Sequence, residues 1–141
     1  MQALSRLFQL YNFPQRSAEA RPHVAAIEEK IGIQLPMDYK RYLSNYAGFA
    51  GFINQEYVEL WNAEEILEAN KDCEISAYLP GILGIGGNGA GELIGLEQSP
   101  YGQFRIVLSP LIGLSPENTI VIGNSFHDFL ARLDRGENWF N

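Results

Sequence analysis

Apolar side chains recur every three or four residues in the first third of the chain, the spacing of helices that bury one face. The first such stretch, residues 3–12, ends before Pro14 because proline lacks the N–H that a helix needs. The second is predicted to begin near Pro22 and to end at Gly32, which readily adopts a left-handed conformation. The third is predicted to run from Pro36 to Gly48. The predicted inward-facing residues are Leu4, Leu7, Phe8, Tyr11, Val24, Ile27, Ile31, Tyr39, Tyr42, Leu43 and Tyr46.

The pattern changes to short strands in the second half. Strands are predicted at residues 57–61, 79–85, 92–96, 104–108 and 119–122, most of them bounded by glycine or proline clusters. In the fourth of these, Phe104, Ile106 and Leu108 alternate with Arg105 and Val107, which predicts one buried face.

Two further helices complete the pattern. A brief one is predicted from Asn62 through Leu67, with Glu65 positioned to complete a capping box. The last is predicted to begin at Ser125 and to stop at Gly136. Its apolar residues, at helical spacing, are Phe126, Phe129, Leu130 and Leu133.

Helices first, then consecutive strands, then one helix are typical of an α+β domain. We expect a mainly antiparallel sheet of about four to six strands, because the connections between strands are short. N-terminal helices and a C-terminal helix should flank this sheet. A length of 141 residues fits one domain, and 46% hydrophobic with 12% aromatic residues argues against disorder.

The composition also bears on the compartment. No apolar run is long enough to cross a membrane, and residues 1–16 lack the apolar stretch of a secretory signal. The single cysteine, Cys73, cannot form an intramolecular disulfide or a cysteine-based metal site. We therefore expect a cytoplasmic protein that does not bind membranes.

The net charge of −7 is unevenly distributed along the chain. Residues 1–47 carry six basic and four acidic groups, whereas the remainder carries four basic and thirteen acidic groups. An acidic surface repels phosphate backbones, so nucleic acid is not an expected partner. A basic protein partner fits better, although the acidity alone can equally serve solubility.

The glycine-rich residues 84–91 look like a phosphate cradle but fail its specific tests. Glu92 stands where a P-loop needs Lys followed by Ser or Thr. A dinucleotide fingerprint needs a helix after the glycines, whereas a strand is predicted here. We interpret the segment as a hairpin in which Asn88 and Gly89 supply the positive-φ turn.

Other chemistry-bearing residues give no catalytic or metal site. Ser125, His127 and Asp128 cannot converge as a triad, because helix residues two apart point to opposite sides. Ser125 is instead predicted to be an N-cap with Asp128 as its capping-box partner. His127 and His23 lack metal-ligand neighbours, and no cofactor is predicted. A carboxylate pair distant in sequence stays open as an enzymatic alternative.

The candidate partner-binding region is residues 54–74, which carry seven acids against Lys71 alone. Aromatic anchors among charges are frequent at protein interfaces. The alternatives are a solvated helix face and a Trp61 that belongs to the core. The candidate residues are Glu56, Tyr57, Glu59, Trp61, Glu64, Glu65, Glu68, Asp72 and Glu74.

Three landmarks in order resemble the SUKH superfamily. Residues 27–43 contain a helix, Gly32, the pair Leu35-Pro36 and a tyrosine-bearing helix, which is similar to the opening of SUKH domains. Residues 83–92 resemble the family's glycine-rich turn with an acidic residue at its end, and residues 125–130 resemble its final helix. The matching positions of the turn are Gly86, Gly89, Gly91 and Glu92.

The resemblance implies an α+β fold without a catalytic site. Many members look like immunity proteins that bind and neutralise bacterial toxins, often nucleases, in the producing cell. Other relatives act as regulatory or scaffolding modules, including some linked to cell-wall assembly. The predicted helix at 3–12 lies outside the common core, so residues 1–16 are expected to be a helical extension of a single domain spanning 1–141.

Overall fold

The computed structural model describes residues 2–140 and contains six α-helices and six strands within that range. The helices are α1 (Gln2–Leu10), α2 (Arg21–Ile31), α3 (Met37–Asn45), α4 (Ile66–Asp72), α5 (Ile75–Tyr78) and α6 (Phe126–Asp134), with a short 3-10 helix η1 (Pro116–Asn118). The strands are β1 (Phe49–Ile53), β2 (Glu56–Leu60), β3 (Ile82–Gly87), β4 (Glu92–Gln98), β5 (Phe104–Pro110) and β6 (Ile120–Gly123).

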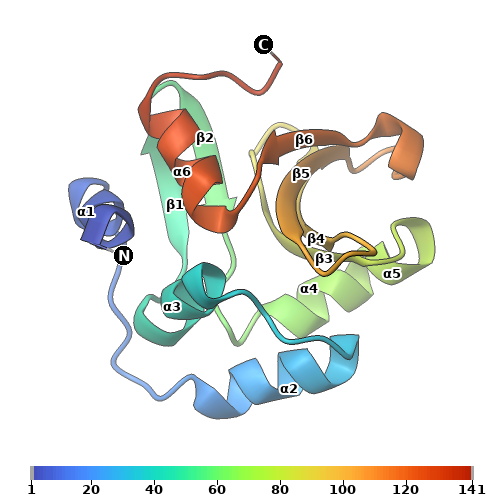
Figure 1. Cartoon of the computed structure of the whole chain (residues 1–141), viewed down its shortest axis with the longest axis horizontal. Coiled ribbons are helices and arrows are strands. Elements are labelled where there is room, and N and C mark those ends of the chain that lie inside the picture. The colour runs from blue at the N-terminus through green and yellow to red at the C-terminus, as the bar shows by residue number, and fades with distance from the viewer. Residues whose placement is uncertain (1, 141) are drawn as a thin grey trace.

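The six strands form one antiparallel sheet in which each strand pairs with its neighbours in sequence, in the order β1-β2-β3-β4-β5-β6. The sheet curls, so that β1 and β2 stand apart from β5 and β6 (Figure 1). Helix α6 contacts both edge strands, β1 and β6. The predicted α+β fold with a mainly antiparallel sheet and flanking helices is confirmed.

The main core lies between one face of the sheet and helices α1, α3 and α6. Its largest fully buried side chains are aromatic rings, which bury more area per residue than aliphatic side chains. The ring of Tyr39 lies 5.2 Å from that of Phe126, centroid to centroid, and the ring of Phe13 stacks at 4.1 Å on that of Phe49. The largest fully buried aromatic residues are Phe8, Tyr39, Tyr42, Phe126 and Phe129.

A smaller core lies on the opposite face of the sheet, where α4 and α5 pack on β3. It explains why the prediction of one buried face for residues 104–108 is wrong. Val107 is 2% exposed, because α5 and the neighbouring strands cover its side of β5. The buried members of this second cluster are Ile75, Leu79, Ile82, Leu93 and Val107.

The predicted ends of α2 and α6 are confirmed. Helix α2 ends at Gly32 with φ of 74°, and Gly136 follows α6 with φ of 86°. At the start of α6, the Ser125 hydroxyl oxygen accepts a hydrogen bond from the Asp128 N–H at 2.9 Å. The Asp128 carboxylate, however, accepts from the N–H of Asn124 and not from that of Ser125, so the predicted capping box is only half formed.

The end of α3 differs from the prediction. The helix stops at Asn45, and Tyr46 is already extended, with φ of −127° and ψ of 153°. Tyr46 leaves the helix because its backbone forms a β-bridge with Gln15, next to a hydrogen bond from the Arg16 N–H to the Asn45 carbonyl. A contact with a distant segment, invisible to local spacing, therefore ends this helix before Gly48.

In the middle of the chain, the bounds of α4 and β3 were also predicted wrongly, and two elements were missed. Helix α4 begins at Ile66, four residues after the predicted start at Asn62, and continues to Asp72, beyond Leu67. Helix α5 was not predicted, and Leu79 is its C-cap residue, so β3 begins only at Ile82. Strand β1 was missed altogether. It pairs with β2 across a tight turn in which Asn54 has a φ of 56°.

The narrowest junction in the sheet joins β2 to β3. Only two residue pairs align there, with Glu59 opposite Gly87 and Leu60 opposite Gly86. A Cβ atom at Gly86 would overlap the Glu59 carbonyl oxygen. Glycine at this position therefore permits the close approach of the two backbones.

Candidate functional site

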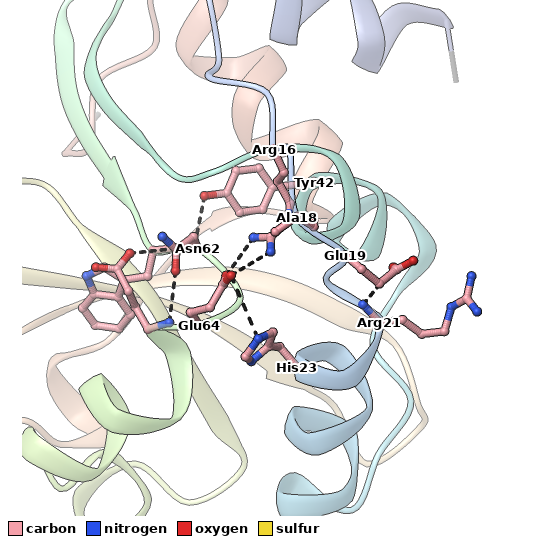
Figure 2. A network of polar contacts seen from close by, with 10 residues as sticks. Arg16, Ala18, Glu19, Arg21, His23, Tyr42, Asn62 and Glu64 are labelled. Carbon is pink, nitrogen blue, oxygen red and sulfur yellow. Dashed lines mark hydrogen bonds and ion pairs between the residues drawn. The ribbon is translucent and has the colours of Figure 1, made fainter.

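An ion pair fastens the segment after α1 to the loop that precedes α4. The Arg16 guanidinium donates two hydrogen bonds to the Glu64 carboxylate, at 2.7 and 2.8 Å (Figure 2). The Arg16 side chain is only 4% exposed, whereas that of Glu64 is 42% exposed. This bidentate geometry is among the stronger ion-pair arrangements.

The pair shifts the titration of Glu64. The hydrogen bonds from Arg16 lower the pKa of Glu64 from 4.5 to about 2, and the His23 imidazole 4.0 Å away acts in the same direction. Next to this pair, the Tyr42 hydroxyl donates to the Trp61 carbonyl at 2.9 Å. Glu64 is thus part of the interior contacts of the chain, in addition to being partly exposed.

Glu65 and Glu56 also have internal partners. Glu65 accepts a hydrogen bond from the Asn62 N–H at 3.0 Å while its own N–H donates to Asn62 Oδ1 at 3.1 Å, so the predicted capping box is confirmed. The Glu56 carboxylate accepts from the Trp139 N–H at 2.8 Å. These two acids orient the local chain and the C-terminal segment.

The other four acids of the candidate region are free of such contacts. Within residues 2–140, their carboxylates form no hydrogen bond or ion pair, and all four residues are exposed. Glu59 lies on β2, Glu68 and Asp72 lie one turn apart on α4, and Glu74 follows α4 with a φ of 52°. The structure therefore divides the seven acidic candidates into three with partners inside the chain and four without.

The two aromatic candidates occupy different environments. Trp61 is partly buried and packs against both hydrophobic clusters, so its ring mainly stabilises the fold. Tyr57 is half-buried, and its ring lies against Gly89, where an added Cβ would be 2.9 Å from Tyr57 Cδ2. The edge of Tyr57 also meets Phe52, with ring centroids 5.4 Å apart and planes at 73°.

Phe52 was missed as a candidate although its side chain is 65% exposed. It lies on β1, which the sequence did not reveal because two of the five residues of that strand are alanine and glycine. The signal that could have found it is the short run of residues 49–53, which contains no polar residue and is bounded by Gly48 and Asn54.

The glycine landmarks build the β3–β4 hairpin. Gly89 and Gly91 have φ of 72° and 90°, whereas Asn88 does not have positive φ, contrary to the prediction. Asn88 is buried instead, and its side chain ties the turn together by donating to the Glu92 carboxylate at 2.6 Å and accepting from the N–H of Ala90. Gly86 lies within β3, at its contact with Glu59.

None of the predicted partner-binding residues lines either of the two depressions described here. One, of about 390 Å³, lies beside α1 and α3 and includes Arg16 and Arg41. The other, of about 160 Å³, lies between β6 and the C-terminal segment and includes Glu137 as its one carboxylate. Neither offers the two carboxylates that a glycosidase-type mechanism requires.

Over the range 2–140, no group of three or more His, Cys, Asp or Glu side chains converges as a metal site would require. In the same range, no helix is long and apolar enough to cross a bilayer.

The comparison with protein families identifies the class. The model of the SMI1 / KNR4 family (SUKH-1) matches residues 23–132, and the chain therefore belongs to this family. The predicted resemblance to the SUKH superfamily is confirmed, and all three landmarks fall within the matched range. No curated protein matches the chain.

Proposed function

We propose that this chain is a non-catalytic immunity protein that binds and neutralises a cognate bacterial toxin in the cytoplasm of the producing cell. Membership in the SMI1 / KNR4 family (SUKH-1) over residues 23–132 is the observation that carries the proposal. The acidic surface supports it, because negative charge speeds the encounter with a basic partner and disfavours nucleic acid.

We propose that the partner contacts the free acids of residues 54–74. Glu68, Asp72 and Glu74 are exposed and have no internal partner within residues 2–140, so they can pair with a basic protein without breaking the fold. Glu56, Glu64 and Glu65 are less suitable, because each already holds a contact inside the chain. Losing those contacts would alter stability and affinity together.

The test is co-expression with the toxin-like protein encoded by the neighbouring gene. We expect growth to be restored and the two proteins to elute as one complex whose affinity falls as salt rises. Failure to restore growth, together with no complex, would contradict the proposal. Recovery of an endogenous protein in place of a toxin, with no protection, would favour the alternative of a regulatory or scaffolding module.

The site within that complex is tested by charge reversal. The double variant E68K/D72K should weaken the complex at least tenfold, since attraction becomes repulsion at two positions. Glu117 is a matched control, because it is exposed but lies on η1, between β5 and β6. If E68K/D72K and E117K bound the toxin with equal affinity, the interface would not include α4.

A further inference from the structure

The face of β1 and β2 that points away from the main core carries an exposed polar and aromatic surface. Successive strand residues point to opposite sides, so Phe49, Ile53 and Val58 enter the core while their neighbours face outward. The outward residues of this surface, hereafter the Glu59 surface, are Ala50, Phe52, Tyr57, Glu59 and, on β3, Gly87.

Glu59 lies in the middle of this surface with only small neighbours beside it. Ala50 is opposite Glu59 on β1, and Gly87 is opposite it on β3. Cross-strand neighbours of this kind have Cβ atoms about 5 Å apart, so a large residue at either position would cover the carboxylate. Within residues 2–140, the Glu59 carboxylate has no hydrogen bond or ion pair, and the residue is exposed.

Aromatic rings border the carboxylate. Tyr57 stands two residues before Glu59 on the same side of β2, about 7 Å away along the strand. Phe52 extends the aromatic border onto β1 through its edge contact with Tyr57. Phe52 remains 65% exposed, which leaves a ring face available to an incoming group.

We propose that the Glu59 surface binds an arginine side chain of a protein partner. A guanidinium matches both features, because it pairs with a carboxylate through two hydrogen bonds and stacks on aromatic rings. The charge of the chain is complementary to a cationic side chain, since the chain beyond residue 47 carries thirteen acidic and four basic groups. The inference rests on the proposed function, because it names the chemistry by which a protein partner is recognised.

The direct test titrates the full chain with acetyl-Arg-Arg-amide and follows its backbone amide resonances. We expect saturable shifts at residues 50–52, 57–59 and 87, and none with the neutral isostere acetyl-citrulline-citrulline-amide. E59Q should abolish these shifts, and F52A should weaken binding at least fivefold. E117Q is the matched control, because Glu117 is an exposed acid on η1, outside residues 54–74, and this variant should retain binding. The amide spectra themselves verify that each variant is folded.

Three results would overturn the inference: absence of saturable shifts, equal shifts with the citrulline peptide, or equal loss of binding in E59Q and E117Q. With a toxin in hand, E59K should weaken the complex at least tenfold while E117K does not. If E59K bound the toxin with unchanged affinity, the Glu59 surface would not be part of the interface. Neutralisation of the toxin by the chain would be unaffected by this result. Peptide binding without toxin protection would reject only the proposed function.

Discussion

At the scale of single residues, two adjacent core tyrosines differ in what their hydroxyls meet. The Tyr42 hydroxyl donates to the Trp61 carbonyl, whereas that of Tyr39 has no partner in the described part of the chain. Y39F should therefore raise the free energy of unfolding by about 1 kcal/mol, and Y42F should lower it by a similar amount. Urea denaturation measures both, and destabilisation by Y39F would show that its hydroxyl is satisfied.

The Arg16–Glu64 pair predicts a pH dependence. Because the pKa of Glu64 is lowered to about 2, the pair stabilises the fold above the unfolded value of 4.5, and this contribution is lost as pH falls towards 2. E64Q should lower stability at pH 7 by about 1 kcal/mol, a small value because solvent screens a carboxylate that is 42% exposed.

The measurement compares urea midpoints of the wild type and E64Q at pH 7 and pH 3. The difference in urea midpoint between the wild type and E64Q should be smaller at pH 3 than at pH 7. E68Q is the control, because Glu68 has no ion-pair partner within residues 2–140. A gap that stays constant from pH 7 to pH 3 would show that the pair does not lower the pKa of Glu64.

At the scale of elements, the sheet depends on the two-residue junction between β2 and β3. G86A should destabilise the protein by more than about 3 kcal/mol, because its Cβ would collide with backbone that cannot move without separating the strands. G91A has positive φ but open space, so strain alone should cost about 1 kcal/mol. Thermal unfolding of both variants tests the difference, and equal losses would contradict the close approach at Gly86.

At the scale of the whole molecule, the N-terminal helix is built into the main core and is tied to the end of α6. Leu4 and Phe8 of α1 are 0% and 1% exposed. The Tyr11 hydroxyl donates to Asp134 Oδ1 at 2.5 Å. Burial, and to a smaller extent this hydrogen bond, raises the pKa of Tyr11 to about 12. We propose that residues 2–16 extend the family domain while sharing its core, since the family match begins at residue 23. Residue 1, also part of the predicted extension, lies outside the described residues.

Shortening single side chains of α1 tests whether this helix is part of the main core. F8A should lower the free energy of unfolding by about 3–5 kcal/mol, because it leaves a cavity among the rings of the main core. L10A lies on the same helix but is 57% exposed, so its effect should stay below about 0.5 kcal/mol. Similar urea midpoints for F8A and the wild type would mean that α1 is not required by the core.

Features that depend on neighbours in sequence were predictable from the chain alone. The helical stripes, the left-handed stop at Gly32 and the caps at Asn62 and Ser125 follow from interactions within a few residues. The order of helices and strands along the chain predicted the fold class, and the family landmarks agreed with it. The end of α3 was predicted wrongly because a bridge between Tyr46 and Gln15, thirty-one positions apart, overrides the local pattern.

The candidate site was predictable as a region of charge but not in its organisation. Seven acids in residues 54–74 are a property of the sequence alone. Only the tertiary structure decided that Arg16 pairs with Glu64 and that the Trp139 N–H donates to Glu56. It also decided that Glu59 has small cross-strand neighbours, which leave its carboxylate exposed beside Phe52. The reason is physical: an ion pair or a cross-strand neighbour depends on distance in space, which spacing along the chain does not determine.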